Sequence, residues 1–371
     1  MKILTGIDVP FKPFGGSLLC ANDWYSDLPE DVEVRFLTLP PPEGIEKWWT
    51  IEDIVMLNIE KAYTPEAFRG YVDKLKELVQ KQIDEFMPDV IHCQHLNYGL
   101  SRAFAELQLN IPLIGICHGT DVQIATQYPF FYENLTYICD NLDLLVFPNE
   151  TMKDDFFRVY KKDKPYEINA LGIPDRYFEV PSSQTNIKDR HALKALYAGR
   201  LLAWKGADIA VESMKYVSSD VSLTVIGNED QKDYKNDLLA LVTENQLNNR
   251  VIFQDQLSRD ELLKAFSNYD VILFPSRSLE AFSLTVVEAQ VKGLPVIYNP
   301  GGGITDTVGD SGIKITENTP TGIAKLLDKV CKNRELLKKA QKSGYKNAEH
   351  YRVSASQARL FSLSEACINS K

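Results

Sequence analysis

The sequence predicts an α/β protein built from two doubly wound domains, and three observations support this fold class. A chain of 371 residues, 44% hydrophobic and 25% charged, exceeds what one hydrophobic core usually holds. Short apolar runs alternate with longer amphipathic stretches, which is typical of parallel sheets covered by helices on both faces. A polar gap rich in Ser, Pro and Asn, residues 179–192, interrupts this alternation, and the pattern begins again after it. We therefore place the boundary between the two domains near residue 179.

The apolar runs give the expected strands in order. Ligands of doubly wound sheets bind at the carboxyl ends of the strands. The cleft between the two domains is therefore where we expect the functional site. From about residue 319 onward the apolar spacing is helical. The expected strands are 2–7, 32–39, 89–94, 112–118, 144–149 and 166–170 in the first domain, and 193–200, 222–228, 251–254, 271–276 and 294–299 in the second.

Charge and cysteine content exclude several classes of protein. The formal net charge of −10 disfavours general binding to nucleic acid. No apolar stretch approaches the length of a membrane span, and the amino terminus predicts a buried strand rather than a signal peptide, so we expect a cytoplasmic protein. The six cysteines lack the spacing of a zinc site or a disulfide framework. The basic residues Arg158, Lys161, Lys162 and Lys164 form either a weak peripheral membrane contact or a solvated helix end.

Two glutamates, Glu280 and Glu288, lie eight positions apart with only uncharged residues between them. Ser283 is a candidate N-cap for a helix from about 284 to 292, and the first backbone amides of that helix, near Leu284 and Thr285, suit a phosphate. One acid then binds a sugar hydroxyl and the other a ribose. The alternative is that Glu280 is a solvated loop acid and Glu288 a helix residue of no special role.

Two cations, Arg200 and Lys205, flank the turn that follows the expected strand 193–200. A guanidinium fork and a mobile ammonium together suit a diphosphate whose negative charge grows as it leaves. The alternative is that a Lys-Gly pair at a helix start has no function. Both possibilities stay open at this point.

The first domain carries weaker signals. Gly15 and Gly16 form a turn after the first strand, but they fall short of a dinucleotide fingerprint or a P-loop. His118 follows a buried strand, where a histidine is as often structural as functional. His92 and His95 have a spacing conceivable for a metal, yet packing and hydrogen bonding explain them better because no third ligand is near. The sequence contains neither Asp-x-Asp nor Gly-x-Ser-x-Gly, so we expect no metal-bridged donor and no serine nucleophile.

These motifs resemble the retaining glycosyltransferases of the GT-B fold, and within them glycosyltransferase family four. The strongest resemblance is in AGRLLAWKG, TVIGN and FPSRSLEAFSLTVVEAQVKGLPVI, followed by GGGITDTV. In the first half the similarity is limited to FGGS, DVIHCQH, HGTD and NALGIPDRYF. The chain departs from the family at Ala281 and Ser283, where Gly-Phe-Gly is common, and at Pro174, where Val is commoner. The first departure leaves less room near the sugar.

The resemblance implies a role for each residue. Arg200 and Lys205 would hold the donor diphosphate, and Glu280 and His118 the donor sugar. Glu288 would bind the ribose. The catalytic set would thus be His118, Arg200, Lys205 and Glu280. The remaining donor-binding residues would be Gly15, Gly16, Gly227, Gln254, Gln256, Phe282, Ser283, Leu284, Thr285 and Glu288.

The implied reaction moves a hexosyl group, with UDP-hexose the expected donor, to an acceptor hydroxyl with retention of configuration and without metal or cofactor. The domains implied are 1–178 together with a C-terminal helix 352–371, and 179–351 for the donor. Trp48 and Trp49 are either a sugar-stacking edge or a loop packed on the core. The rival functions are a nucleotide-sugar epimerase, a phosphorylase and a non-catalytic nucleotide-sugar sensor. A dinucleotide oxidoreductase is disfavoured because the glycine fingerprint is missing.

Overall fold

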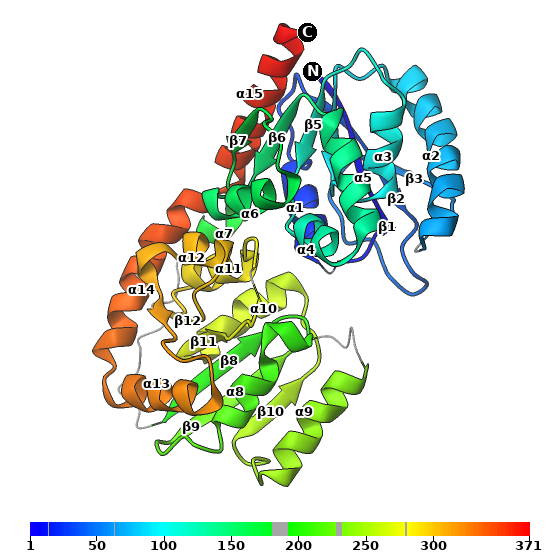
Figure 1. Cartoon of the computed structure of the whole chain (residues 1–371). Coiled ribbons are helices and arrows are strands. Elements are labelled where there is room, and N and C mark those ends of the chain that lie inside the picture. Colours follow the sequence, from blue (N-terminus) through cyan, green and yellow to red (C-terminus); the bar gives the residue numbers. More distant parts are fainter. Residues whose placement is uncertain (14, 63, 180–191, 228–231, 279) are drawn as a thin grey trace. The chain divides into compact units, whose positions relative to one another are not determined.

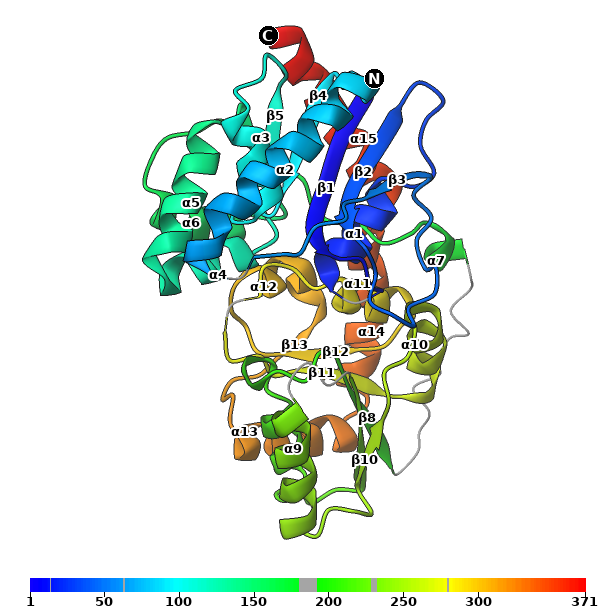
Figure 2. The same ribbon diagram turned by 90° about the vertical axis from the view of Figure 1, so that its right-hand side faces the viewer.

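The computed structural model describes residues 1–13, 15–62, 64–179, 192–227, 232–278 and 280–371. The chain forms two compact units (Figures 1 and 2). Unit 1 comprises Met1–Gly172 and Val353–Lys371, and unit 2 comprises Ile173–Arg352. Most of the polar gap predicted at 179–192 lies outside the described residues. No helix in the described parts of the chain is both long and apolar enough to cross a membrane.

The described residues of unit 1 form a seven-stranded parallel sheet in the order β3-β2-β1-β4-β5-β6-β7. Helices α2 and α3 both contact β1, and Figure 2 shows them against the sheet. The strands are β1 Lys2–Pro10, β2 Glu33–Leu39, β3 Asp53–Met56, β4 Val90–Gln94, β5 Leu113–Ile116, β6 Leu144–Phe147 and β7 Tyr166–Ile168. The helices are α1 Gly16–Trp24, α2 Pro65–Phe86, α3 Gly99–Glu106, α4 Thr120–Gln127, α5 Pro129–Asp140, α6 Glu150–Tyr160 and α15 Val353–Ser370.

The described residues of unit 2 form a six-stranded parallel sheet in the order β10-β9-β8-β11-β12-β13. The strands are β8 Leu193–Ala198, β9 Val221–Ile226, β10 Val251–Gln254, β11 Val271–Phe274, β12 Val296–Tyr298 and β13 Ile313–Lys314. The α-helices are α7 Arg176–Glu179, α8 Ala207–Ser213, α9 Lys232–Glu244, α10 Arg259–Ala265, α11 Leu284–Val291, α12 Gly303–Val308, α13 Pro320–Lys332 and α14 Glu335–Ala348. Short 3-10 turns span Ala203–Lys205, Phe266–Asn268, Gly309–Ser311 and Glu349–Tyr351.

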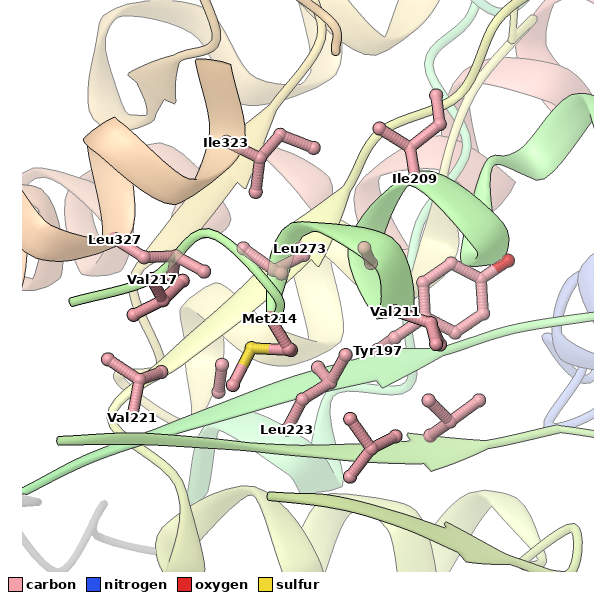
Figure 3. Packing of buried hydrophobic residues seen from close by; sticks show 14 of the residues in the cluster. Tyr197, Ile209, Val211, Met214, Val217, Val221, Leu223, Leu273, Ile323 and Leu327 are labelled. Atoms are coloured by element: carbon pink, nitrogen blue, oxygen red, sulfur yellow. The ribbon is translucent and has the colours of Figure 1, made fainter. Parts of the chain in front are cut away.

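One face of the unit 2 sheet packs against α8, α9 and α13 around a continuous apolar core. Alternate residues of β8, β9 and β11 point to this face, as a strand period of two requires. Figure 3 shows Met214, the residue that follows α8, above Leu223 of β9, with Leu273 of β11 beside them. This core fixes the strands whose carboxyl ends carry the predicted donor residues.

The predicted two-domain parallel α/β class is confirmed, but two strands were not predicted. The edge strand β3 is only half-buried along its whole length, and β13 has two residues. Neither offers the continuous apolar run by which buried parallel strands are recognised. Cys20, Cys93, Cys117 and Cys139 are buried free thiols, as expected.

The boundary between the units differs from the predicted one, because residues 173–178 belong to unit 2. Ile173 pairs with Arg352 in a parallel bridge. The Tyr177 hydroxyl donates to Asp260 of α10 at 2.8 Å, and its carbonyl accepts from Lys292 at 2.8 Å, next to the end of α11. These contacts depend on tertiary partners that no local pattern shows.

The C-terminal helix α15 is bound to unit 1 through buried hydrogen bonds. The indole nitrogen of Trp24 donates to Ser356 Oγ at 2.7 Å, and this hydroxyl donates to the Ala170 carbonyl at 2.6 Å. The Asn169 amide donates to the Ser356 carbonyl at 3.0 Å. Ser356 therefore connects α1, the segment after β7 and α15.

We expect Ser356→Ala to destabilise unit 1 by about 1–3 kcal/mol, because the buried indole N–H of Trp24 would lose its acceptor. The measurement is the free energy of urea unfolding followed by tryptophan fluorescence. Ser362→Ala, an exposed position on the same helix, is the matched control and should change little. Equal effects of the two substitutions would contradict this account of Ser356.

Candidate active site

The site residues of unit 2 lie in loops that leave neighbouring strands. Arg200 and Lys205 follow β8, and Glu280 follows β11, which pairs with β8 in parallel. Carboxyl ends of parallel strands meet at the same edge of a sheet. The topology therefore brings these two loops together.

Glu280 forms an ion pair with Lys205. The Lys205 Nζ to Glu280 Oε2 distance is 2.7 Å, and the glutamate side chain is 2% exposed. The Ser276 hydroxyl donates to the other carboxylate oxygen, Oε1, and the Lys205 ammonium also lies 4.4 Å from the centre of the Trp204 ring. A buried carboxylate needs such partners because its desolvation is costly. Glu280 is therefore not the solvated loop acid of the alternative interpretation.

The turn that carries Lys205 approaches β11 closely. Gly206 has φ +76°, and a Cβ atom there would lie 2.2 Å from the Pro275 carbonyl oxygen. Only glycine fits this conformation and this contact. The backbone of Glu280 in turn bridges to Gly302 of the triple-glycine run. Three loops are thus held within one small region.

Arg200 differs from Lys205 in its exposure to solvent. Its side chain is exposed, and its carbonyl accepts a hydrogen bond from the Tyr197 hydroxyl at 3.3 Å. The structure joins Lys205 directly to Glu280, whereas Arg200 lies at the start of the same turn. A guanidinium offers a planar fork of donors that matches the geometry of a phosphate.

Glu288, the fifth residue of α11, is buried and paired with Arg259. The Arg259 Nε to Glu288 Oε1 distance is 2.5 Å, and the side chains are 14% and 5% exposed. The guanidinium also lies over the Tyr177 ring, 5.3 Å from its centre. Arg259 is not among the residues predicted from the sequence, although Ser258 and Glu261 form a recognisable capping box that places Arg259 at the start of α10.

The first turn of α11 matches the predicted helix start with one difference. Ser283 occupies the N-cap position, but its side chain makes no capping hydrogen bond. The amides of Leu284 and Thr285 are therefore not capped by Ser283. Phe282, immediately before the cap, packs edge-to-face on Tyr351 with ring centres 5.5 Å apart.

The other predicted donor residues lie further along the sheet. Gly227 follows β9, and a Cβ atom there would lie 2.2 Å from the Gly199 carbonyl oxygen. Gln254 ends β10 and Gln256 follows it, both with exposed side chains. Because β10 is separated from β11 by two strands, these glutamines are remote from Glu280 along the sheet.

In unit 1, His118 follows β5 and is half-buried. Its Nε2 lies 2.7 Å from Gln94 Oε1, and its backbone N–H donates to Asp121 at 2.8 Å. Burial, reinforced by His95 with its ring 4.6 Å away and only partly opposed by Asp121, lowers the pKa of His118 to about 3. The ring is therefore neutral at pH 7.

His92 and the glycine turn complete the predicted set in unit 1. His92 is fully buried, hydrogen-bonded to Tyr25 and Ser364, and burial lowers its pKa to about 3, which agrees with the packing interpretation. Gly15 has φ +105° just before α1, and a Cβ atom on Gly15 or Gly16 would meet open space. Among the described residues, no group of three or more His, Cys, Asp or Glu side chains is placed to hold a metal.

Two secondary candidates have structural explanations. The Trp48 and Trp49 rings lie 4.9 and 5.3 Å from the ring of buried Phe11, so they pack the loop onto the core. In the basic cluster, Lys162 pairs with Asp140 at 2.6 Å. Arg158 likewise pairs with Asp155 at 2.6 Å. Two of the four charges in this cluster are thus locally balanced.

Sequence profiles of two families match the chain. One, described as Glycosyl transferases group 1, matches residues 182–347, and the other, described as Glycosyltransferase Family 4, matches residues 26–174. The chain belongs to the family-four glycosyltransferases of the GT-B fold. The two profiles match the two halves of the chain that the structure divides into units.

Individual relatives agree with this assignment. The chain is 27% identical to a D-inositol 3-phosphate glycosyltransferase of Xylanimonas cellulosilytica over 50% of its own length and 48% of the relative's, so it spans about half of that protein. It is 20% identical to an N-acetyl-alpha-D-glucosaminyl L-malate synthase of Bacillus anthracis, over 91% of the chain and 89% of that relative.

Solved structures show the same fold. The sucrose-phosphate synthase of Thermosynechococcus elongatus superposes with a TM-score of 0.83 at 19% identity, covering all of both chains. The Anabaena protein HepE, solved in complex with UDP and glucose, gives a TM-score of 0.79 at 16% identity and covers 99% of this chain and 100% of its own.

We expect acidification to destabilise unit 1 through His92 and His118. Their pKa values are about 3 in the folded chain and about 6.5 in an unfolded one, so the unfolded state binds more protons between these values. The free energy of unfolding therefore falls as the pH falls below about 6.5, by up to about 1.4 kcal/mol per pH unit for each histidine.

Urea unfolding between pH 7.5 and 5 measures this slope. His92→Gln and His118→Gln should each reduce it, whereas His350→Gln, at an exposed position, should not. Slopes that are the same in all four proteins would show that these two histidines do not titrate on unfolding.

Proposed function

We propose that this glycosyltransferase transfers a hexosyl group from a UDP-sugar to an acceptor hydroxyl, with retention of configuration and without a metal ion. The observation that carries the proposal is the paired cluster Lys205–Glu280–Ser276 in the loops after β8 and β11. Transfer from a nucleotide sugar needs positive charge for the leaving diphosphate and a fixed acceptor group for a sugar hydroxyl. In this cluster Lys205 supplies the positive charge and Glu280 supplies the acceptor.

The leaving diphosphate is stabilised by Lys205 and Arg200 together with the amides at the start of α11. Lys205 is shared with Glu280, so Arg200 brings the second positive charge. Glu280 keeps its orientation through Lys205 and Ser276 and accepts a hydrogen bond from the donor sugar. In the proposed front-face displacement the departing phosphate oxygen takes the acceptor proton, so no separate base is required.

UDP is the proposed nucleotide because HepE was solved with UDP and with UDP-glucose, and the fold of this chain is similar. Glu288 is the proposed ribose ligand, with Arg259 holding one of its oxygens. The roles of Gly15, Gly16, Gly227, Gln254, Gln256 and Phe282, the contact of His118 with the donor sugar, and the cytoplasmic location stay predictions.

Incubation of the purified protein with UDP-hexoses and a panel of hydroxyl acceptors tests the proposal. Product detected by mass spectrometry, with the donor's anomeric configuration in its NMR spectrum and a rate unchanged by EDTA, is the expected result. A product of inverted configuration, or a rate abolished by EDTA, contradicts the mechanism. UDP binding without any turnover across the panel favours the nucleotide-sugar sensor, and sugar interconversion without acceptor favours the epimerase.

We expect Lys205→Ala to lower kcat by about 10²–10³-fold, because the leaving diphosphate loses one preorganised positive charge, and to lower stability as well, because buried Glu280 loses its cation. Initial rates with UDP-glucose and far-UV circular dichroism give the two readouts. Lys339→Ala, an exposed lysine of α14, is the matched control. Wild-type turnover by the Lys205 variant rules out the assigned role.

The ribose contact of Glu288 can be isolated by comparing UDP with 2′-deoxy-UDP and 3′-deoxy-UDP in calorimetric titrations. In the wild-type protein the loss of the contacted hydroxyl should weaken binding by about tenfold or more, as for a hydrogen bond to a charged group. In Glu288→Gln the same loss should matter much less, because the two changes remove one shared contact. Additive effects of ligand and protein changes would place the ribose elsewhere.

A further inference from the structure

A chain of hydrogen-bonded polar side chains crosses the interior of unit 1 from the C-terminal helix to His118. His92 Nε2 lies 2.8 Å from Ser364 Oγ, and His92 Nδ1 lies 2.8 Å from the Tyr25 hydroxyl. Gln94 lies 2.8 Å from Tyr25 through its Nε2 atom and 2.7 Å from His118 Nε2 through its Oε1 atom. The first four members are at most 1% exposed, so water does not compete for their hydrogen bonds.

The Ser364 end of this series of hydrogen bonds determines which partner donates in each bond. Ser364 donates its only hydroxyl proton to the Leu360 carbonyl at 2.8 Å, so its oxygen must accept from His92 Nε2–H. A neutral histidine has one donor and one acceptor, and His92 Nδ1 therefore accepts from the Tyr25 hydroxyl. The Tyr25 oxygen is left to accept from the Gln94 amide nitrogen.

The other end agrees with this direction. The Thr5 hydroxyl donates to the His92 carbonyl at 3.0 Å and can only accept from Gln94 Nε2, which lies 3.3 Å away. A reversed amide would point its oxygen at two oxygens whose protons are already used. If every donor and acceptor in the series were exchanged, Ser364 could no longer donate to the Leu360 carbonyl, and Thr5 could no longer donate to the His92 carbonyl. The Gln94 oxygen thus faces His118 and requires a proton on His118 Nε2.

We propose that Gln94 is a positioning residue that fixes His118 as the Nε2–H tautomer and so makes His118 Nδ1 a hydrogen-bond acceptor for a ligand hydroxyl. The ring is half-buried with Nε2 turned towards Gln94, and Nδ1 has no hydrogen-bond partner among the described residues. That the hydroxyl belongs to a sugar rests on the proposed function.

The charge state of His118 supports this role. Its pKa of about 3 keeps the ring neutral despite the nearby Asp121, so Nδ1 retains its lone pair at pH 7. A neutral ring that accepts a hydrogen bond selects ligands that donate one at this point. It does not act as a general acid, because the protonated form is scarce at neutral pH.

Long-range 1H–15N correlation spectra of histidine-labelled protein test the tautomer directly. The chain has five histidines, and the His118→Gln spectrum identifies the signals of His118. We expect the Nε2–H pattern for His118 in the wild-type protein at pH 7. An Nδ1–H pattern or a cationic ring overturns the proposal, and this result needs no variant that could misfold.

Variants of Gln94 test its part in fixing the tautomer. Gln94→Met removes the acceptor, and His118 should then give averaged signals of the two tautomers. The control is Gln80→Met on α2. In the wild type Gln80 donates to Asp84, so its loss should not change the His118 signals. A pure Nε2–H pattern in Gln94→Met shows that Gln94 is not the cause.

Kinetics separate this inference from the proposed function. With UDP-glucose, Gln94→Met should lower kcat by about tenfold or more and leave UDP affinity unchanged, because a positioning role affects the sugar hydroxyl and not the nucleotide. Equal kcat in wild type and variant contradicts the role in turnover. A wild-type protein that binds no UDP contradicts the proposed function, while the tautomer result still stands.

Discussion

Burial of a carboxylate requires a compensating charge, and this constraint shapes the loops at the carboxyl edge of unit 2. Glu280 and Glu288 are each nearly inaccessible to water, and each has a cation within hydrogen-bonding distance. A buried carboxylate without a partner costs several kcal/mol. Lys205 and Arg259 come from segments far from the two acids in sequence. The first pair therefore fixes two loops against each other, and the second fixes α10 against α11.

These ion pairs would affect the binding of a nucleotide-sugar donor. The free energy needed to orient Glu280 is spent during folding, because Lys205 and Ser276 already hold both carboxylate oxygens. A ligand that meets such a preorganised group does not lose further entropy to order it. In the proposed site Lys205 is shared between Glu280 and the diphosphate, and Arg200, at the start of the same turn, adds a second positive charge.

The sequence was sufficient for the two parallel sheets, which follow from the alternation of strands and helices. The strand order, which makes β8 and β11 neighbours and so brings their loops together, came from the structure. The sequence was not sufficient for Arg259 or Gln94, because their partners are distant in the sequence, nor for Ser276, because its contact with Glu280 depends on the conformation of the loop that they share. Arg259 lies 29 positions from Glu288, and Gln94 lies 24 positions from His118. Trp48 shows the converse, since a conspicuous aromatic pair packs on Phe11.

The two units hold the side chains at their strand ends in different ways. Unit 2 holds its acids in ion pairs, and these carboxylates are the proposed acceptors for the sugar and ribose hydroxyls. Unit 1 holds His118 through a neutral series of hydrogen bonds that begins at Ser364 on the C-terminal helix. A neutral acceptor needs no compensating cation, whereas a buried carboxylate does. Because α15 supplies Ser364, the last helix contributes to unit 1 a hydrogen-bond end point as well as packing.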